Sequence, residues 1–490
     1  MTKPDRKASL TENRPMQPKL AVVMALLTTI TSLLATSCSN PKPTDGAGTT
    51  VGTPTATYDT SSTSNDQSKG LKIGALFSST GDLASIAQPL PSAVKLAVDT
   101  VNGCGGINGA PVTLVSEDDQ SDPSAGSAAM TKLTAVDKVA GVVGAFGSGV
   151  STAAAAIAVQ NKTMIISPGS TSPVFTDRAK KGEYKGYWAR TAPPDTYQAQ
   201  AMAQLAIKRG FKKVATIAIN NDYGIGFEKE FVASFKKLGG TITNEAKPTH
   251  YDPKGVSFTS EVRAIFEGKP QAIAALVYPD TGAIILKDAY EQGLTKGVTI
   301  MLPDGAYSPK FPDQVGKSKD GEFIINGAIG TVPGAHGKAL EDFNKLWTAT
   351  GKPLTPYLQH TWDATALIML AAQAAKTNTG EGIASKIREI SSGSGEEVGD
   401  LCKAITLLKA GKKINYQGAS GNVDIDAQGD VVGTYDIWQV QPDGKLKTID
   451  RVNIQGIVAT KADPKPTKLP DLLDINRLNF RVGWAVVTLP

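Results

Sequence analysis

Two short segments rich in glycine, serine and threonine contain the residues of this chain best suited to bind a small anion. They are VVGAFGSGVST, residues 142–152, and MIISPGSTSP, residues 164–173. Each begins with an apolar run typical of a buried strand and ends in a turn of small hydroxyl residues. The first turn leads into a predicted helix over residues 151–160, and a helix N-terminus presents free backbone N–H groups. Because no catalytic residues accompany them, the turns predict binding of a small carboxylate without chemistry on it.

The residue patterns of common enzyme active sites are missing from the sequence. The three histidines, His250, His336 and His360, are far apart, which argues against a metal site or a histidine general base. Neither Ser148 nor Ser167 lies in a G-x-S-x-G motif, and no phosphate-binding GxxxxGK[S/T] loop occurs. We therefore expect no enzymatic activity, no metal and no cofactor.

Length and composition indicate an ordinary globular protein with two domains or lobes. The chain has 490 residues, of which 41% are hydrophobic and 20% charged. Its net charge of +5 comes from interspersed acids and bases. A nucleic-acid surface would instead show clustered lysine and arginine, so we expect no nucleic-acid partner.

The N-terminus has the pattern of an export signal. Residues 20–35 are apolar, too few for a membrane span, and are followed by ATSC. Cys38 resembles the lipidated cysteine of a bacterial lipoprotein, which predicts a signal peptide over residues 1–37; a plain secretory signal is the alternative. Translation starts at Met1 or at Met16. The low-complexity residues 38–70 predict a disordered tether.

From Leu71 onward the sequence alternates between predicted strands and helices, which is typical of an α/β fold with parallel sheets. Strands are expected at residues 71–77, 112–117, 139–144, 163–167, 214–219, 272–277, 298–302 and near 431–440. Helices are expected at residues 91–101, 125–136, 151–160, 283–292, near 338–350 and 358–376, after a cap at Asp195, and after NNDYGIG. In such sheets ligands bind beyond the C-terminal ends of the strands, where both hydroxyl turns fall.

Eight segments in this order resemble the type I periplasmic solute-binding proteins of ABC importers. The resemblance covers about residues 71–440 and is carried by IGALFSSTGDLA, VNGCGGINGAPVTLV, DDQSDP, VVGAFGSGVST, IISPGSTSP, YWARTAPPD, NNDYGIGF and MLPDGAY. More narrowly, the chain resembles the Leu/Ile/Val-binding subunits for branched-chain and neutral amino acids. TAPPDTYQAQA and NNDYGIGFEKEF are most similar to neutral amino-acid permease subunits.

The resemblance implies two α/β lobes, each a parallel sheet flanked by helices, joined by three crossovers. The crossovers are expected near residues 190–194, 329–333 and 416–421. Lobe 1 is then expected over residues 71–191 and 332–418, and lobe 2 over residues 192–331 and 419–460. Residues 461–490 form a tail that the resemblance does not cover.

The resemblance also implies a ligand site in the cleft between the lobes. In lobe 1, Ser148 and Thr171 match positions that bind the α-carboxylate of an amino acid, and Ser170 and Thr171 also offer oxygens to its ammonium group. In lobe 2, Asp304 matches the acid that pairs with the ammonium group. The remaining lobe 2 positions are aromatic: Tyr278 contacts the ligand, and Tyr223 covers it when the lobes close.

Each of these residues also has a structural alternative. These are a turn-stabilising role for Asp304, a core position for Tyr223, helix capping by Ser148 and Ser151, and packing beneath the turn by Phe146 instead of lining the pocket. Asp280 is a rival partner for the ammonium group, or else a cap of the following helix.

Two departures from the family pattern leave the specificity open. Asp304 is one methylene shorter than the usual glutamate, and Ser85 lies near a position where an aromatic residue often lines the side-chain pocket. The candidate loops contain no lysine or arginine, which favours a ligand with a neutral side chain.

The function implied is that of a lipid-anchored, extracytoplasmic subunit that captures a small neutral amino acid and delivers it to an ABC permease and its ATPase. A receptor for an amino acid, amide or urea that feeds a signalling partner is the alternative. With both in lobe 1, Cys104 and Cys402 are expected to form a disulfide in an exported protein, or else to be free buried thiols.

Overall fold

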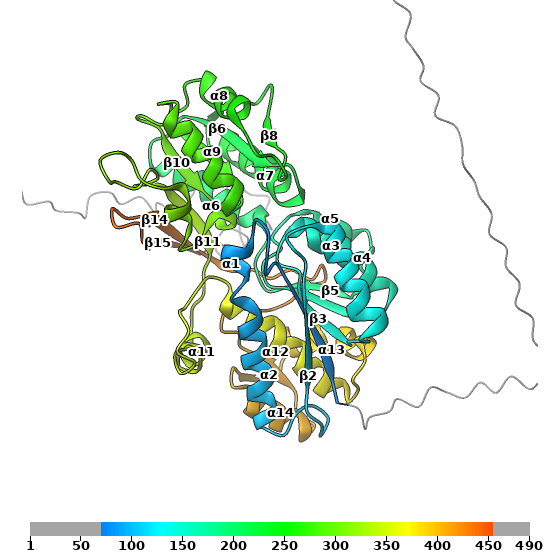
Figure 1. Cartoon of the computed structure of the whole chain (residues 1–490). Coiled ribbons are helices and arrows are strands. Elements are labelled where there is room, and N and C mark those ends of the chain that lie inside the picture. Colours follow the sequence, from blue (N-terminus) through cyan, green and yellow to red (C-terminus); the bar gives the residue numbers. More distant parts are fainter. Residues whose placement is uncertain (1–69, 454–490) are drawn as a thin grey trace, which may run out of the picture. The chain divides into compact units, whose positions relative to one another are not determined.

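A computed structural model of the chain describes residues 70–453, which belong to one compact unit (Figure 1). The predicted signal peptide, the lipidation site at Cys38, the tether up to residue 69 and the tail at 461–490 lie outside the described residues. None of the helices in residues 70–453 combines the length and the apolarity needed to cross a bilayer.

The first sheet has five strands, all parallel, in the order β2-β1-β3-β4-β5. Alternate strand residues point to opposite faces, and helices cover both faces. Ile73 and Phe77 pack in the same core cluster as residues of α2 and α12, whereas Leu76 and Val142 pack with residues of α3 and α4. The strands are β1 (Lys72–Phe77), β2 (Thr113–Asp118), β3 (Gly141–Gly144), β4 (Met164–Ser167) and β5 (Trp188–Arg190).

The second sheet has eight strands, in the order β15-β14-β11-β10-β9-β6-β7, with β8 also paired to β6. We call the elements around the first sheet lobe 1 and those around the second sheet lobe 2. The strands are β6 (Lys213–Ile219), β7 (Thr241–Ile242), β8 (Thr249–Tyr251), β9 (Ala272–Leu276), β10 (Thr299–Leu302), β11 (Ile329–Pro333), β14 (Thr434–Val440) and β15 (Leu446–Asn453). A separate pair consists of β12 (Glu396–Val398) and β13 (Ile414–Tyr416).

The second sheet is parallel from β7 to β11 and antiparallel at β14 and β15. The sequence pattern predicted only parallel sheets. The short turn between β14 and β15 accounts for that antiparallel pair, because a few residues connect antiparallel neighbours and a parallel crossover needs a dozen or more. β14 enters the sheet from the third passage of the chain and runs antiparallel to β11.

Two helices begin earlier than predicted, and both begin next to the candidate site. α4 starts at Ser148 and α9 starts at Pro279, instead of residues 151 and 283. The helices of lobe 2 are α6 (Asp195–Lys208), α7 (Asp222–Lys237), α8 (Thr259–Glu267), α9 (Pro279–Glu291), the 3-10 turn η2 (Asp304–Ala306) and α10 (Phe311–Val315).

The remaining helices accompany the first sheet; among them, α2, α12 and α14 contact one another. They are α1 (Ala84–Ala87), α2 (Leu90–Gly103), α3 (Pro123–Thr131) with the π turn η1 (Lys132–Val136), α4 (Ser148–Gln160), α5 (Val174–Lys180), α11 (Lys338–Thr348), α12 (Leu358–Ala375), α13 (Gly380–Ser392) and α14 (Leu401–Lys409).

The chain passes between the two sheets at three places: after β5, after β11, and between β13 and β14. The third passage is held to lobe 1 by Asp363 of α12. Its carboxylate accepts hydrogen bonds from Tyr416 Oη (2.9 Å), Ala419 N (2.8 Å) and Ser420 N (2.7 Å). The exact residue limits of the lobes stay a prediction.

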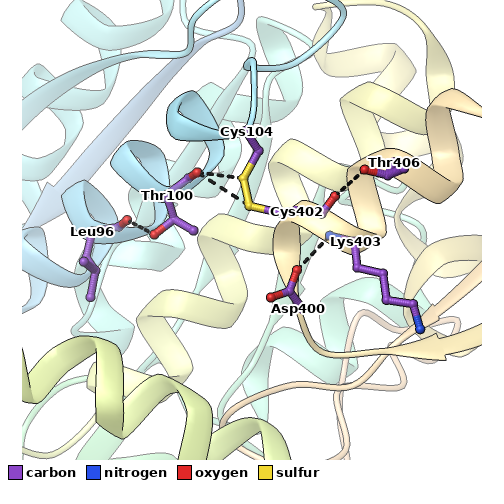
Figure 2. The surroundings of a disulfide bond; sticks show 7 residues. All are labelled: Leu96, Thr100, Cys104, Asp400, Cys402, Lys403 and Thr406. Carbon is purple, nitrogen blue, oxygen red and sulfur yellow. Dashed lines mark hydrogen bonds between the residues drawn. A yellow bond between two sulfur atoms is a disulfide. The ribbon is translucent and has the colours of Figure 1, made fainter.

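A disulfide between Cys104 and Cys402 joins the end of α2 to the first turn of α14 (Figure 2). The two Cα atoms are 5.5 Å apart, although the cysteines are separated by 298 residues in sequence. In the same turn, the Asp400 carboxylate accepts a hydrogen bond from Lys403 N (2.7 Å) and caps α14. The bond therefore links two distant segments of lobe 1.

Candidate functional site

A small cavity lies between the two lobes, at the C-terminal ends of strands from both sheets. It has a volume of about 10 Å³. Its lining includes Leu83, Phe146 and Ser148 from lobe 1, and Tyr223, Tyr278 and Asp304 from lobe 2. The lining contains no lysine or arginine. The site therefore offers hydroxyls, aromatic rings and one carboxylate to a ligand.

The lobe 1 wall is built from the two hydroxyl turns. Ser148 is the first residue of α4, and its hydroxyl accepts a hydrogen bond from Ser172 N (3.3 Å). Ser170 Oγ lies 2.8 Å from Ser151 Oγ and donates to Phe146 O (3.1 Å), so this hydroxyl joins the two turns to each other. The first backbone N–H groups of α4 have no partner within the helix, and a helix N-terminus of this kind can bind an anion.

Neither serine caps α4, contrary to the alternative role considered for them. The residue at the cap position is Gly147, and no side chain caps the helix. Ser151 instead donates to Ala145 O (3.0 Å). The cap position is thus occupied by a residue without a side chain, which leaves the helix N-terminus accessible from the cavity.

A fully buried arginine holds the second turn in place. Arg190, the last residue of β5, donates from Nη1 to Ser170 O (3.1 Å) and Ser172 O (2.9 Å). Its Nε donates to the carboxylate of Asp430 (2.8 Å), which belongs to the third passage between the lobes. The guanidinium group therefore links the turn at Thr171 to two of the three interlobe connections.

The lobe 2 wall is centred on Asp304, the first residue of η2, which is buried. Tyr223 Oη donates to Asp304 Oδ1 (2.9 Å) and accepts from Gly305 N (3.0 Å). Tyr357, from lobe 1, donates to Asp304 Oδ2 (2.6 Å). The Tyr223 ring stacks on that of Tyr278, with centroids 5.4 Å apart. Asp304 is thus a buried acceptor whose current partners are two neutral hydroxyls.

Asp195 places a second buried carboxylate next to this wall. It is the first residue of α6, and its backbone N–H donates to Thr171 O (2.8 Å). Its carboxylate lies beside the hydroxyl of Thr171 and near the guanidinium of Arg190, and both act to lower its pKa. Burial, and next the charge of Asp304, raise the pKa of Asp195 well above its usual range. Burial also raises the pKa of Asp304, against the hydrogen bonds from Tyr357 and Tyr223.

The sequence pattern had assigned Asp195 to cap α6, and this assignment is wrong. Pro194 occupies the cap position, and the Asp195 side chain makes no bond to the helix. Within residues 70–453, neither Asp195 nor Asp304 forms an ion pair, and Arg190, the cation that acts on Asp195, is itself paired with Asp430, so the site is short of positive charge. A ligand that carries a positive charge would balance it.

The two lobes are in direct contact across the cleft. Asp82 of lobe 1 accepts hydrogen bonds at Oδ1 from Asp280 N (2.8 Å) and Thr281 N (3.1 Å), and at Oδ2 from Thr281 Oγ1 (2.7 Å). α9 has no side-chain cap from its own N-cap residue, Tyr278. Asp82 therefore caps a helix of the opposite lobe, and burial raises the pKa of its carboxyl group.

The structure places four of the six predicted binding residues on the wall of one cavity: Ser148, Tyr223, Tyr278 and Asp304. Ser170 and Thr171 lie in the adjoining turn and are fully buried. Their roles toward a ligand stay a prediction. Asp280 is exposed on α9 and accepts from Gln314 Nε2 (2.6 Å), away from the lining. Phe146 both lines the cavity and packs edge-on against Tyr357.

Sequence reasoning missed Tyr357 and Asp195 as candidate site residues. Tyr357 follows a proline-rich loop and precedes α12, with no motif around it. Asp195 follows two prolines, and such an acid usually caps a helix. For Asp195 the available signal was its place at the first expected crossover, near residues 190–194, which the resemblance puts beside the cleft.

These two lobes, with a polar cavity between them, are the architecture of a ligand-binding protein that closes around a small molecule. Residues 90–443 match the family described as "receptor family ligand binding region", and the chain belongs to this family. Its fold is that of the type I periplasmic binding proteins.

Three similar proteins illustrate the range of that family. A chemotactic signal transduction system substrate-binding protein, BasB, from Halobacterium salinarum is 29% identical over 389 residues, which cover 76% of this chain and 87% of BasB. The leucine-binding protein LivK from Thermotoga maritima superposes with a TM-score of 0.66 at 24% identity, over 78% of this chain and 99% of LivK. LivJ from Streptococcus pneumoniae, in complex with isoleucine, has a TM-score of 0.64 at 22% identity, over 78% and 99% of the two chains.

Proposed function

We propose that this protein is the extracytoplasmic substrate-binding subunit of an ABC importer and that it captures a neutral amino acid in the cleft between its lobes. The observation that carries the proposal is the polarity of the cleft. The lobe 1 side of the cleft has a helix N-terminus and the two hydroxyl turns. Next to these lie the buried carboxyl groups of Asp304 and Asp195, which have no ion-pair partner in the described part of the chain.

This polarity suits a zwitterion. The α-carboxylate would bind at the N–H groups of α4 and at Ser148 and Thr171, and the ammonium group would bind at Asp304 with Asp195. Charged hydrogen bonds contribute roughly 1.5–3 kcal/mol each, and a micromolar complex needs about 8 kcal/mol in total. Several such contacts suffice after the cost of ordering the ligand and the lobes. The absence of lysine and arginine from the lining supports a neutral side chain.

A binding screen with the twenty amino acids, small amides and urea tests this proposal. We expect at least one neutral amino acid to raise the melting temperature and to compact the protein in small-angle scattering. Asp304→Asn should weaken binding of that amino acid at least tenfold in calorimetry and leave the fold intact. Asp280→Asn, an exposed acid of the same lobe, is the matched control. Failure of every compound to bind, or equal affinities of the two variants, would contradict the proposal.

A signalling receptor is the second candidate function, and one specific observation favours it: the similar protein BasB is named as part of a chemotactic signal transduction system. The two functions differ in the partner that recognises the closed lobes. A strain without this protein should lose uptake of the labelled amino acid if the partner is a permease. Loss of chemotaxis toward the same amino acid, with uptake unchanged, would assign the protein to signalling.

Attachment to the membrane through Cys38 belongs to the same proposal. An importer subunit or receptor works beside its membrane partner, and a lipid on Cys38 would keep the protein there. Cys38→Ala should release the protein from the membrane fraction. Release should not change ligand affinity, because the candidate site lies wholly within residues 70–453.

A further inference from the structure

The cavity at Asp304 is much smaller than the side chain of most amino acids. Its volume of about 10 Å³ is close to the space that one water molecule needs. A ligand held by its ammonium group at Asp304 therefore needs room for its side chain beyond the walls of this cavity.

A second pocket lies directly behind one of those walls, and its volume is about 620 Å³. Residues of both lobes line it, among them Leu340 and Leu354 of lobe 1 and Tyr307 of lobe 2. Pockets for small organic ligands span roughly 300–1,000 Å³, so this pocket is in their range. We call it the Tyr357 pocket.

Tyr357 separates the two spaces. Its ring lines the large pocket, while its hydroxyl donates to Asp304, which lines the small cavity. The backbone of Tyr357 is in the left-handed region, with φ of 66°, directly before α12. A bulky residue is uncommon in that conformation, and such residues concentrate at functional sites. Tyr357 therefore connects the large pocket to the predicted ammonium partner, and it is held by its hydrogen bond to Asp304 and by ring contacts with Phe146 and His360.

The wall of the Tyr357 pocket carries buried polar atoms without a partner. They are Asn344 Oδ1, Thr355 Oγ1 and His360 Nδ1. Only 3% of the His360 surface is exposed, and burial lowers its pKa to about 3, so the ring is neutral at neutral pH. Both cations of the lining are paired, Arg451 with Asp436 and Lys445 with Asp443, and Asp313 adds one further carboxyl group. A wall of mixed apolar and hydrogen-bonding groups without a free cation suits an uncharged group with an N–H or O–H donor.

We propose that the Tyr357 pocket receives the side chain of the ligand, and that the ligand is an amino acid with a large aromatic side chain bearing a hydrogen-bond donor, such as tyrosine or tryptophan. This inference rests on the proposed function. The ligand ammonium replaces the Tyr357 hydroxyl at Asp304 Oδ2, the Tyr357 ring turns aside, and the side chain extends toward Asn344 and His360. Small aliphatic amino acids leave the large pocket unfilled and bind more weakly.

Calorimetry with alanine, leucine, phenylalanine, tyrosine and tryptophan tests the inference on wild type and on a variant with a filled pocket. Asn344→Phe places a ring in the Tyr357 pocket from α11, without touching Asp304 or Tyr357. Leu346→Phe is the matched control, because Leu346 lies on the same helix, is 41% exposed and does not line the pocket. We expect tyrosine or tryptophan to bind wild type about tenfold more tightly than alanine.

We further expect Asn344→Phe to lower the affinity for tyrosine and tryptophan much more than the affinity for alanine, and so to remove that preference, and Leu346→Phe to keep it. Tyr357→Phe, which lacks only the hydroxyl, should bind the aromatic ligands at least as tightly as wild type. The inference is overturned if leucine or alanine binds as tightly as the aromatic amino acids, or if Asn344→Phe leaves aromatic binding unchanged. If small amino acids alone bind, or if another neutral amino acid of the full screen binds and none of these five does, the proposed function stands and this inference fails.

Discussion

At the scale of single residues, the site is defined by buried carboxyl groups without a cation. Surface acids such as Asp118 and Asp122 have lowered pKa values because N–H and O–H groups or a lysine stabilise their charge. Asp304 and Asp195 show the opposite shift, because burial disfavours their charge. A buried acid of this kind is costly for the free protein and becomes favourable when a positive ligand arrives.

This electrostatic arrangement predicts that amino-acid affinity rises with pH. Free protein holds Asp304 and Asp195 with pKa values above the usual 3.8, and a bound ammonium group would lower them. Binding then releases protons, and affinity falls as the pH drops below the raised pKa values. Calorimetry in buffers of different ionisation enthalpy measures the proton release. Asp195→Asn should reduce it; an affinity independent of pH between 4 and 7 would contradict this account.

The stability of the free protein, unlike its affinity for an amino acid, should fall as the pH rises. A carboxyl group whose pKa is raised by folding stabilises the fold below its unfolded pKa, and this contribution is lost as the pH rises through the folded value. Asp363 and Asp119 have pKa values raised to about 6 by burial. The free energy of unfolding without ligand should therefore decrease between about pH 4 and pH 6. Chemical denaturation across that window measures it, and an increase would show that these carboxyls are not buried as described.

At the scale of elements, closure depends on helix ends that are completed by the opposite lobe. Asp82 supplies to α9 the cap that its own N-terminus lacks. Ser172 Oγ of lobe 1 donates to Asp222 O at the start of α7 (2.7 Å), and Lys254 of lobe 2 pairs with Asp122 of lobe 1 (3.0 Å). These contacts exist only while the lobes are together, so they stabilise the closed arrangement and not the separate lobes.

Removal of the Asp82 cap should therefore weaken closure. A helix cap contributes about 0.5–2 kcal/mol, so Asp82→Ala should lower amino-acid affinity roughly tenfold, mainly through faster dissociation. The melting temperature of the free protein should change little. Asp280→Ala is the control, because its carboxylate bonds only within lobe 2, to Gln314. Stopped-flow dissociation rates measure the effect, and equal rates for the two variants would show that the cap does not hold the lobes together.

The same dependence on the opposite lobe explains which elements could be predicted from sequence. Strands β6, β9 and β10 match their predicted ranges within a residue or two, because a continuous apolar run marks a doubly covered strand. The start of α9 was missed because its cap comes from Asp82, almost 200 residues away in sequence. α8, α13 and β15 were not predicted, although in α13 the buried Ile383, Ile387 and Ile390 follow the helical spacing and could have indicated the helix.

In the candidate site, too, the residues in local motifs could be predicted and those placed by tertiary structure could not. Ser148, Tyr223, Tyr278 and Asp304 stand in short motifs at the ends of predicted strands, and the structure gathers them around one cavity. Tyr357 stands in no motif, and its place is set by the passage of the chain from lobe 2 back to lobe 1. A residue that reaches the site through tertiary structure alone leaves no local pattern to recognise.

At the scale of the whole molecule, lobe 1 is assembled from two segments that are far apart in sequence. Helices α12 and α13 pack on the first sheet, although in the sequence the lobe 2 elements from β6 to β11 stand between β5 and these helices. During folding, these two segments have to come together across a long loop. A covalent link across so long a loop is especially effective, because it reduces the conformational entropy of the unfolded chain.

The disulfide between Cys104 and Cys402 provides that link, and it should contribute substantially to stability without contributing to binding. Closing a loop of 298 residues stabilises by at most about 5–6 kcal/mol in the chain-entropy account, and measured bonds commonly give about 2–4 kcal/mol. The Cys104→Ser/Cys402→Ser variant should lose about that much unfolding free energy in urea. Its ligand affinity should match wild type, because neither cysteine lines the cavity or the Tyr357 pocket. Wild type treated with reductant should behave like the variant; a reduced protein as stable as the oxidised one would show that the bond does not constrain lobe 1.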